Sequence, residues 1–179
     1  MAARERLPPW HEHHRLANGR EVLIRPIRPE DAEPLRAGFA LLEPESLRAR
    51  LAGGRDLGTA DAGRVARPNP RTEFTLVTTD LEGPGEAVIA AVAHVRTDPA
   101  AHEGAFILLV SRFITGLGMR RYLLTRIVKW ARSRRLGLLR GELPRDPALL
   151  DLASSLGFQL DDATTDAALV QVSLTLPAR

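Results

Sequence analysis

Residues 105–121 have the sequence AFILLVSRFITGLGMRR, and we expect this stretch to decide the fold. Ala105–Val110 is a short, continuous apolar run, which is typical of a strand buried on both faces. Gly116 and Gly118 separate this run from a helix that begins at Met119. Glycines at a strand-to-helix turn allow close approach of the backbone, and the first N–H groups of the helix point outward together. The pattern therefore predicts a site for an anion.

Arginines surround this predicted site. Arg120 and Arg121 in the first helical turn would add charge-assisted contacts to the anion, and Arg112 would do the same. A dinucleotide-binding fold would need a third glycine and an acidic residue about 20 residues further on. Arg121 occupies the position of the third glycine, and no acidic residue follows until Glu142. The sequence therefore excludes that fold.

The composition is that of one ordinary globular domain, with 179 residues, 44% of them hydrophobic and 26% charged. The absence of cysteine rules out disulfides and thiolate metal sites. The histidines at positions 11, 13 and 14 have no matching ligands elsewhere, so we expect no metal site. No apolar leader or membrane span is evident, which favours the cytoplasm and no membrane partner. We expect a tail over residues 1–18 and one domain over residues 19–179.

Positive charge is concentrated in one part of the chain. Gly104–Gly141 holds nine basic residues and no acidic one, although the net charge of the whole chain is only +3. This segment should carry a positive field, so nucleic-acid binding is one interpretation. Aromatic residues make up only 4% of the chain, and no recognition-helix motif is evident. We therefore expect no nucleic acid partner.

The hydrophobic periodicity predicts strands that alternate with helices. Strands are expected over residues 20–27, 73–80, 86–96, 105–110, 136–143 and 168–176. Helices are expected over residues 29–42, 44–51 and 146–156, and from residue 119 onward. The apolar face of the helix after the glycines would consist of Leu123, Leu124, Ile127, Val128 and Ala131. Gly53–Thr72 is rich in Gly, Pro, Asp and Arg, which predicts an irregular surface stretch, with one helical turn as an open alternative.

Two separated motifs resemble one known family. GLGMRRYLLTRIVKWARSRRLGLLRGEL followed by DPALLDLASSLGF is similar to the core of the GNAT superfamily of acyl-CoA-dependent N-acyltransferases. Gly116 and Gly118 match the glycines of its pyrophosphate loop, and Leu156-Gly157-Phe158 match the end of its last helix. The opening from Gly19 resembles bacterial protein-acetyltransferase domains. The resemblance implies an α/β fold with a mixed, mostly antiparallel sheet of six to seven strands, about four helices and a splayed parallel strand pair.

The resemblance also implies a cosubstrate site. The strands Ala105–Val110 and Leu136–Leu143 would part, and the pantetheine arm of acetyl-CoA would pair with the open edge. The acceptor would be an amine, for instance a lysine of a protein, and a homodimer is one open assembly state. The residues implied to contact the cosubstrate are Leu109, Val110, Arg112, Thr115, Gly116, Leu117, Gly118, Met119, Arg120 and Arg121.

The sequence departs from the family pattern at the positions of the chemistry. Phe113 stands where the loop usually has Gln or Arg, and the loop is about two residues shorter than usual. Ala105 stands where related protein acetyltransferases have a glutamate as general base, and Glu103 is the nearest substitute. Ala153 replaces the tyrosine that serves as general acid, which leaves Tyr122 as the candidate.

Each remaining candidate has a second interpretation. Glu103 is a base or a solvated strand-edge residue, and Tyr122 is an acid or a packing residue. Asp146 contacts substrate or caps its helix. His94 faces the acceptor or is a structural histidine. Two functions therefore remain open, namely an N-acyltransferase and a catalytically weakened domain that binds or senses acyl-CoA.

Overall fold

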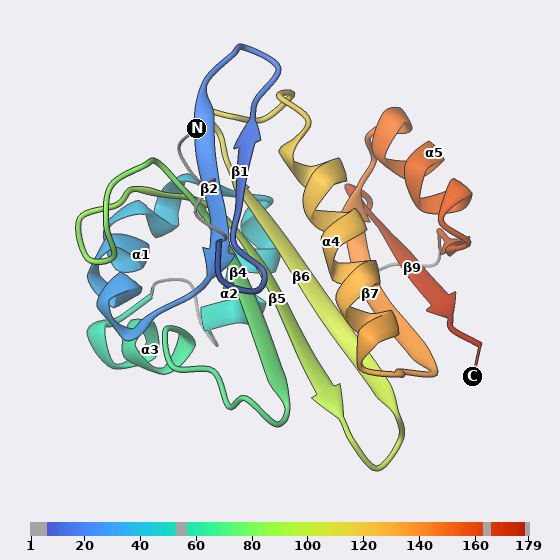
Figure 1. Ribbon diagram of the computed structural model, residues 1–179. Helices are drawn as coiled ribbons and strands as arrows, with labels where there is room; N and C mark the ends of the chain where they lie inside the picture. Colours follow the sequence, from blue (N-terminus) through green and yellow to red (C-terminus); the bar gives the residue numbers. More distant parts are fainter. Residues whose placement is uncertain (1–6, 53–56, 163–165, 178–179) are drawn as a thin grey trace, which may run out of the picture.

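The computed structural model describes residues 7–52, 57–162 and 166–177. One sheet runs through the molecule and is covered by helices on both faces (Figure 1). The strands are β1 (Glu12–Arg15), β2 (Glu21–Pro26), β3 (Leu42–Glu43), β4 (Glu73–Thr79), β5 (Ile89–Asp98), β6 (Glu103–Ser111), β7 (Leu138–Pro144), β8 (Gln159–Asp161) and β9 (Leu169–Thr175). The helices are α1 (Ala32–Gly38), α2 (Glu45–Ala52), α3 (Thr59–Val65), α4 (Met119–Ser133) and α5 (Pro147–Ser155).

The strands are arranged in the order β1-β2-β4-β5-β6-β7-β9-β8, and β3 pairs separately with β6. All neighbours are antiparallel except β6 and β7, which are parallel. The expected α/β fold with a mixed, mostly antiparallel sheet and a single parallel pair is therefore confirmed. The sheet has more strands than the sequence predicts, because β1, β3 and β8 are too short to produce a periodic signal.

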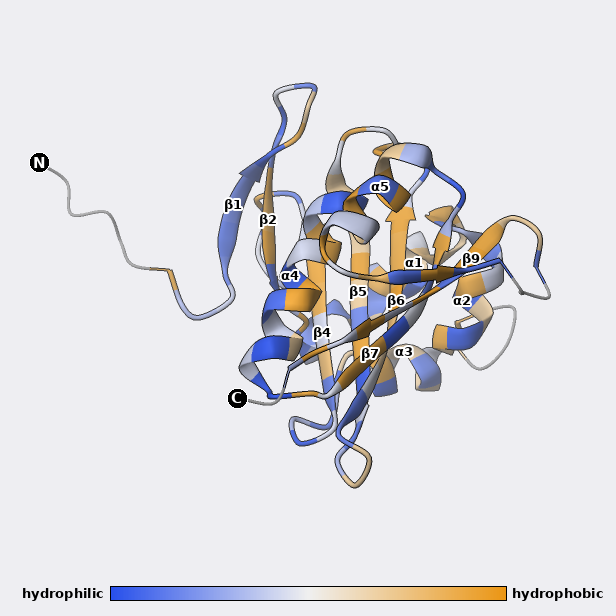
Figure 2. Ribbon diagram, turned by 90° about the vertical axis from the view of Figure 1, so that its right-hand side faces the viewer, coloured by the Kyte–Doolittle hydropathy of each residue, from blue (hydrophilic) through white to orange (hydrophobic). Residues whose placement is uncertain are grey.

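Two apolar cores lie on the two faces of the sheet. One contains the buried face of α4 together with Phe106, Leu108 and Val110 of β6. The other lies under α1, α2 and α3 and contains Leu109. Successive strand residues point to opposite faces, so the apolar run of β6 supplies both cores, as its continuous hydrophobicity predicts. Figure 2 shows the central strands as the most hydrophobic part of the chain.

The long helix α4 packs as its sequence predicts. It has one buried apolar face, and its arginines lie mostly on the other side. The five residues predicted for the apolar face are all buried, namely Leu123, Leu124, Ile127, Val128 and Ala131. This packing fixes the start of α4 against the end of β6, so the turn between them is held at both ends.

The parallel pair separates after four residues. Pairing runs from Glu103 opposite Leu138 to Phe106 opposite Gly141, and it goes no further. Gly141 has no side chain, and the buried Phe106 ring lies in the space that a Cβ at Gly141 would occupy. Beyond this point β7 continues beside β9, whereas β6 continues beside β5. We call the space between the diverging ends of β6 and β7 the strand gap.

The N-terminal segment forms part of the sheet. Residues 1–18 were expected to be a tail, but β1 lies within them and pairs with β2, while residues 1–6 lie outside the described residues. The Arg126 side chain of α4 forms an ion pair with Glu12 and donates to the Trp10 carbonyl over 3.1 Å. A tail of mixed polarity gives no strand signal by itself, and its place is set by these contacts with α4.

Two other segments differ from the sequence-based expectation. The helix predicted over residues 29–42 consists of α1 flanked by two short 3₁₀ turns, and it ends in β3. In the stretch Gly53–Thr72, residues 59–65 form α3, while residues 53–56 lie outside the described residues. Within the described ranges, no helix has the length and apolar character needed to cross a bilayer.

A buried ion pair fixes the connection from β2 to α1. Arg25 Nη1 and Nη2 donate to the two carboxylate oxygens of Asp31 over 2.6 and 2.8 Å. Asp31 also accepts the Arg28 amide over 2.8 Å. Both side chains of the ion pair are almost fully buried. The pair therefore orients α1, and with it the segment that leads into β3.

The contact between Phe106 and Gly141 gives a test of the strand gap. We expect Gly141→Ala to lower the free energy of unfolding by roughly 1–3 kcal/mol, because the new methyl group forces the Phe106 ring out of a packed core. Gly83→Ala is the matched control, since its Cβ would meet open space. Urea unfolding midpoints measure both. An unchanged midpoint for Gly141→Ala would show that the ring is not confined there.

Candidate functional site

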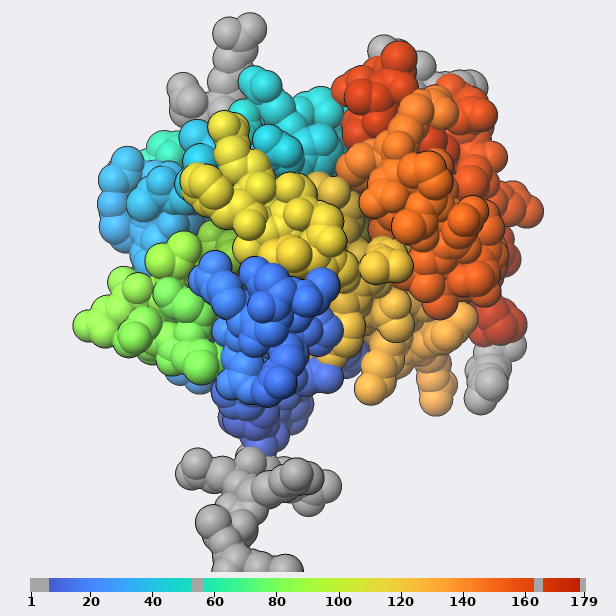
Figure 3. All heavy atoms as spheres, turned by 90° about the horizontal axis from the view of Figure 1, so that it is seen from above, coloured from blue at the N-terminus to red at the C-terminus, as the bar shows by residue number. Residues whose placement is uncertain are grey.

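The turn between β6 and α4 has the backbone conformation that its two glycines predict. We call residues 112–118 the glycine loop. Gly116 and Gly118 have φ values of +81° and +86°, in the left-handed region that other residues rarely adopt. A Cβ at Gly116 would meet no atom within 4 Å, so the backbone faces open space there. Figure 3 shows the loop at the top of the molecule, between the N-terminal hairpin and α5.

The amides at this turn are available to a ligand. Among the hydrogen bonds of the described chain, none uses the N–H group of Gly116 or Gly118. The N-cap of α4 is Gly118, which has no side chain to accept from the first turn of the helix. The amides of residues 119–121 have no partner inside the helix, because an α-helix leaves its first N–H groups unpaired. These donors and the helix dipole favour an anion at this point.

A cavity of about 150 Å³ lies at the glycine loop, and we call it the loop cavity. Seven of the ten residues predicted to bind the cosubstrate line it, namely Val110, Thr115, Gly116, Gly118, Met119, Arg120 and Arg121. Asp146, predicted to contact the acceptor, also lines this cavity. Its side chain accepts the Ala148 amide over 3.0 Å, so it acts as the N-cap of α5.

The other three predicted residues lie around the loop cavity and do not line it. Leu109 is buried in the core under α1 to α3, and Leu117 packs against the core on the α4 side. Arg112 has its side chain directed to Glu43, with 3.6 Å between Nε and Oε1. Phe113 is 73% exposed. The loop therefore offers no polar side chain at the position where the family has Gln or Arg, and the polar groups that face the loop cavity are mainly amides and the arginines of α4.

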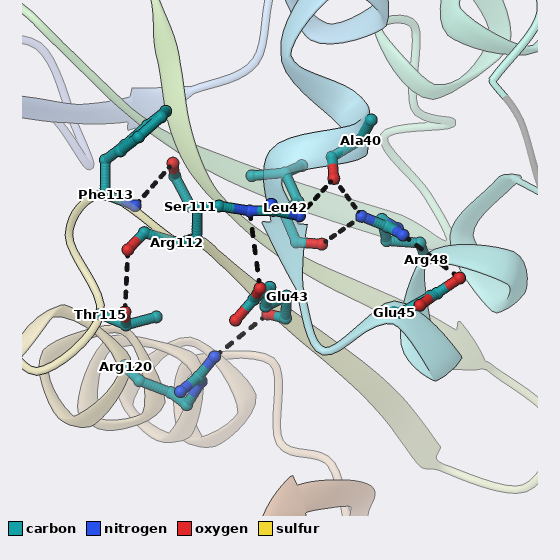
Figure 4. Close-up of polar contacts among 10 residues, drawn as sticks. All are labelled: Ala40, Leu42, Glu43, Glu45, Arg48, Ser111, Arg112, Phe113, Thr115 and Arg120. Carbon is teal, nitrogen blue, oxygen red and sulfur yellow. Dashed lines mark hydrogen bonds and ion pairs between the residues drawn. The ribbon is translucent and has the colours of Figure 1, made fainter.

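The strand gap is partly occupied by the chain itself. Strand β3 pairs with the end of β6, with Leu42 opposite Ser111 and Glu43 opposite Val110. Arg120 Nη2 donates to the Glu43 carbonyl over 3.1 Å (Figure 4). Sequence reasoning missed this pairing, because two residues after a helix carry no strand signal. Val110, predicted to pair with a ligand, has Glu43 opposite it.

A second and larger cavity opens where β6 and β7 part. This sheet cavity has a volume of about 540 Å³ and is lined by Ala105, Ile107 and Glu142 among others. A third cavity of about 150 Å³ adjoins it and contains His94. The two share Arg50, Ala105 and Ile107. From Phe106 to Val110 the strand rises roughly 13 Å, so β6 connects the sheet cavity with the loop cavity.

His94, predicted to face the acceptor or to be structural, lines the third cavity, which adjoins the sheet cavity. Its Nδ1 is 2.8 Å from Thr75 Oγ1, and its Nε2 is 3.9 Å from Glu73 Oε1. Burial lowers the pKa of His94 to about 4, an effect that Glu73 opposes and that Arg96 and Arg64 reinforce. The imidazole is therefore neutral at pH 7, and its contact with Glu73 is not an ion pair.

The two predicted catalytic residues do not line these cavities. Glu103 lies at the start of β6, where β6 and β7 are still paired, and its Oε1 is 3.4 Å from Arg140 Nη2. Tyr122 stacks on His14 of β1, with ring centroids 4.0 Å apart. Burial raises the pKa of Tyr122. The structure therefore places Tyr122 in the packing between α4 and the N-terminal strand.

Two glutamates near the sheet cavity have arginine partners. Glu142 forms an ion pair with Arg50, and Glu73 lies 3.4 Å from Arg96. Desolvation raises the pKa of Glu73, but the Asn69 amide, His94 and Arg96 together lower it below its usual value. A carboxylate whose pKa is lowered, as that of Glu73 is, is a weak proton acceptor. In the described part of the chain, no group of three or more metal-ligating side chains is present.

The positive stretch Gly104–Gly141 is partly neutralised in three dimensions. Arg112, Arg126 and Arg140 form ion pairs with Glu43, Glu12 and Glu103, all from outside that stretch. Neutralised arginines contribute less to a long-range field than the sequence suggests. Among the described residues, the basic side chains of this stretch without an ion pair lie at both ends of α4, namely Arg120 and Arg121 at its start and Lys129, Arg132, Arg134 and Arg135 near its end.

Comparison with known proteins identifies the fold. No model of a known protein family matches the sequence. The GNAT domain of S. lividans PAT has a TM-score of 0.71 and 20% identity, over 96% of this chain and 100% of that domain. Ribosomal-protein-S5-alanine acetyltransferase from Vibrio fischeri has a TM-score of 0.61 and 15% identity, over 86% of this chain and 92% of that one. Spermidine N-acetyltransferase from Vibrio cholerae has a TM-score of 0.60 and 9% identity, over 86% of this chain and 93% of that one.

The arrangement of strands and helices defines a broad structural class. It is an α/β protein with a mixed sheet that opens between two parallel strands, next to a helix whose N-cap residue is a glycine without a capping side chain. Its likeness to the acetyltransferase structures then assigns the fold within that class, and the chain has the GNAT fold. The fold that the glycine loop and the Leu-Gly-Phe motif implied is therefore confirmed.

The environment of His94 makes stability depend on pH. The unfolded histidine takes up a proton near pH 6.5, whereas the folded one takes it up near pH 4. Stability is therefore retained above pH 6.5 and is lost as the pH falls to about 4. We expect wild type to lose on the order of 3 kcal/mol more than His94→Gln between pH 7 and pH 4. Urea unfolding at both pH values measures this difference, and equal losses would mean that His94 is not desolvated.

Proposed function

We propose that this protein is an acyl-CoA-dependent N-acyltransferase, which transfers an acyl group such as acetyl from CoA to an amine. One observation supports this most. The unpaired amides of Gly116, Gly118 and the first turn of α4 line a cavity at one end of the strand gap, and a larger cavity lies at its other end. One molecule with a diphosphate at one end and a thioester at the other would reach both.

The residues at the loop cavity fit a diphosphate. Arg120 Nε is buried and has no hydrogen-bond partner, and the space at Gly116 is open. Arg121 is exposed at the same helix terminus. The amides of the glycine loop would hold the phosphate oxygens, and Arg120 and Arg121 would supply the charge-assisted contacts. The bound thioester would supply the activated acyl carbon.

The sheet cavity is suited to hold the acceptor amine. Orientation of the amine against the thioester supplies much of the acceleration in such a reaction. In the transfer, a bond forms between the amine nitrogen and the acyl carbon, and the carbon–sulfur bond breaks. The amine loses a proton, and the thiolate gains one. Neutral His94 beside the cavity accepts hydrogen bonds, and a water chain along Glu73 and His94 would lead the proton away.

The charged side chains around the sheet cavity and the adjoining third cavity are paired with one another. Arg50, Arg64, Arg96 and Arg140 lie beside Glu142, Asp61, Glu73 and Glu103. Asp161, which is exposed, also lines the sheet cavity. These opposite charges offset each other, so the cavity accommodates a cationic acceptor such as a lysine side chain.

A second candidate function is an acyl-CoA-binding module without turnover. Ala105 leaves the sheet cavity without a carboxylate at the position of the family's base, and Glu73 and Glu142 are held by arginines. Glu103, the predicted substitute, lies outside the cavity and beside Arg140. Binding needs only the glycine loop and the strand gap, so it does not depend on these residues.

Calorimetry with acetyl-CoA tests the binding that both functions share. We expect wild type to bind and Gly116→Ala to bind at least tenfold more weakly. The methyl group strains the left-handed turn by about 1–2 kcal/mol and turns the amides away from the ligand. Gly85→Ala is the matched control, because Gly85 also has a positive φ of +90° but lies in another loop. Absence of binding heat from wild type would contradict both candidate functions.

Restoration of a carboxylate separates the two candidate functions. We expect Ala105→Glu to raise the rate of thiol release from acetyl-CoA at least tenfold with a peptide amine, because a positioned base contributes roughly 10²–10⁴-fold. Ala105 is exposed beside the sheet cavity, so the longer side chain has room. Ala105→Gln is the control of equal size and should give no rise. No turnover by wild type or Ala105→Glu, despite tight binding, would favour the binding module.

A further inference from the structure

The four consecutive carbonyls of residues 40–43 are all hydrogen-bonded, and we call these residues the β3 segment. Ala40 O accepts from the side chain of Arg48, and from Arg112 Nη2 over 3.4 Å. The Leu41 carbonyl accepts the Arg112 amide over 2.9 Å. The Leu42 carbonyl accepts Arg48 Nη1 over 3.1 Å. With Arg120 on the Glu43 carbonyl, three arginines from three parts of the chain hold this segment (Figure 4).

The β3 segment covers part of the edge of β6 that faces the strand gap. One edge of β6 is paired with β5 along its whole length up to Val110. The other edge is paired with β7 as far as Phe106 and with β3 from Val110 onward. The Arg112 amide points to Leu41, and alternate residues of a strand face the same edge. Leu108 is therefore the residue between Phe106 and Val110 whose backbone groups face the gap.

A ligand that spans the gap needs more of this edge than Leu108 alone provides. An extended arm that adds to a sheet edge forms main-chain hydrogen bonds at alternate residues, and Val110 is the next one after Leu108. Val110 has Glu43 opposite it. An arm between the loop cavity and the sheet cavity would therefore compete with β3 for the same backbone groups.

Two of the three arginines belong to the predicted anion site, and both are incompletely paired. Arg120 donates to a neutral carbonyl, its Nε is buried without a partner, and it lines the loop cavity. Burial lowers the pKa of Arg120, an effect that Asp146 and Glu43 only partly offset. Arg112 makes only long contacts through its side chain, 3.4 Å to Ala40 O and 3.6 Å to Glu43 Oε1. Hydrogen bonds from such groups to a phosphate would be about twice as strong as those to a carbonyl.

We propose that the β3 segment is an internal competitor for the edge of β6 on which the pantetheine arm of an acyl-CoA would lie. The diphosphate at the glycine loop draws Arg112 and Arg120 away from the segment, and the arm then replaces β3 beside Val110. This inference rests on the proposed function of the site. β3 has only two residues, whereas stable strands usually have at least three, so it is short enough to be displaced.

A reversible tether tests the competition directly. Leu42 and Ser111 lie opposite each other and form a non-hydrogen-bonded pair, because the adjacent pair of Leu41 and Arg112 is hydrogen-bonded. The Cα atoms of such a pair are about 4.5 Å apart, which suits a disulfide. The chain has no cysteine of its own, so the variant with Leu42→Cys and Ser111→Cys forms no other disulfide.

We expect the oxidised double variant to bind acetyl-CoA at least tenfold more weakly than the same variant after reduction. Comparison of one variant in two redox states cancels the cost of replacing buried Leu42. Adenosine diphosphate, which has the diphosphate and no pantetheine arm, should bind both states alike. Calorimetry measures all four affinities. Equal binding of acetyl-CoA in both states would overturn the competition by β3 and leave the proposed function standing. Absence of acetyl-CoA binding in both states and in wild type would overturn the proposed function, and the competition with it.

Hydrogen exchange on wild type gives a second test that needs no variant. We expect saturating acetyl-CoA to raise the exchange rate of the Glu43 amide at least fivefold, because its pairing with Val110 of β6 is lost. Amides of β4 serve as the internal control and should not change. Unchanged or slower exchange of the Glu43 amide, at a concentration where calorimetry shows binding, would mean that β3 stays in place and does not compete.

Discussion

The site depends on the point at which β6 and β7 stop pairing. Phe106 lies against Gly141, which has no side chain, and the two strands follow different neighbours from there on. A sheet edge inside a protein must satisfy its backbone groups, because unpaired buried N–H and C=O groups are costly. The gap therefore needs an occupant, and in this structure β3 provides part of it. The glycine loop and the loop cavity lie at one end of the strand gap, and the sheet cavity lies at its other end.

Arginines connect the anion site to the segment that occupies the gap. Arg120 lines the loop cavity, Arg112 lies at the start of the glycine loop, and both hold carbonyls of the β3 segment. A guanidinium has five donors in a fixed plane, so one side chain satisfies several acceptors. In the proposed competition, the same groups would hold the β3 segment in one state and bind the phosphate in the other. Coupling of this kind requires a differential interaction with the two states, which the phosphate charge would supply.

The loop cavity and the sheet cavity differ in the groups that line them. The loop cavity combines backbone amides, whose direction depends on glycine conformations, with the arginines of the first turn of α4. The sheet cavity is lined mainly by side chains, and its Glu142 is held by Arg50. Binding groups made by the backbone tolerate sequence change, whereas proton transfer needs one particular group with a suitable pKa. A chain with this fold can therefore keep the backbone groups of the glycine loop while its acid–base residues change.

The sequence by itself determined the elements with strong periodicity and the glycine loop. The apolar run of β6, the apolar face of α4 and the positive φ angles of Gly116 and Gly118 all follow from local chemistry, because burial and backbone freedom act on neighbouring residues. Only the tertiary structure decided which distant side chains meet. No local pattern predicts the pairing of Glu43 with β6 or the hydrogen bond from Arg48 to the Leu42 carbonyl. The same holds for the ion pair of Arg50 with Glu142 and for the stacking of His14 on Tyr122. Such contacts are fixed by how the sheet and helices pack, and packing brings together residues far apart in the chain.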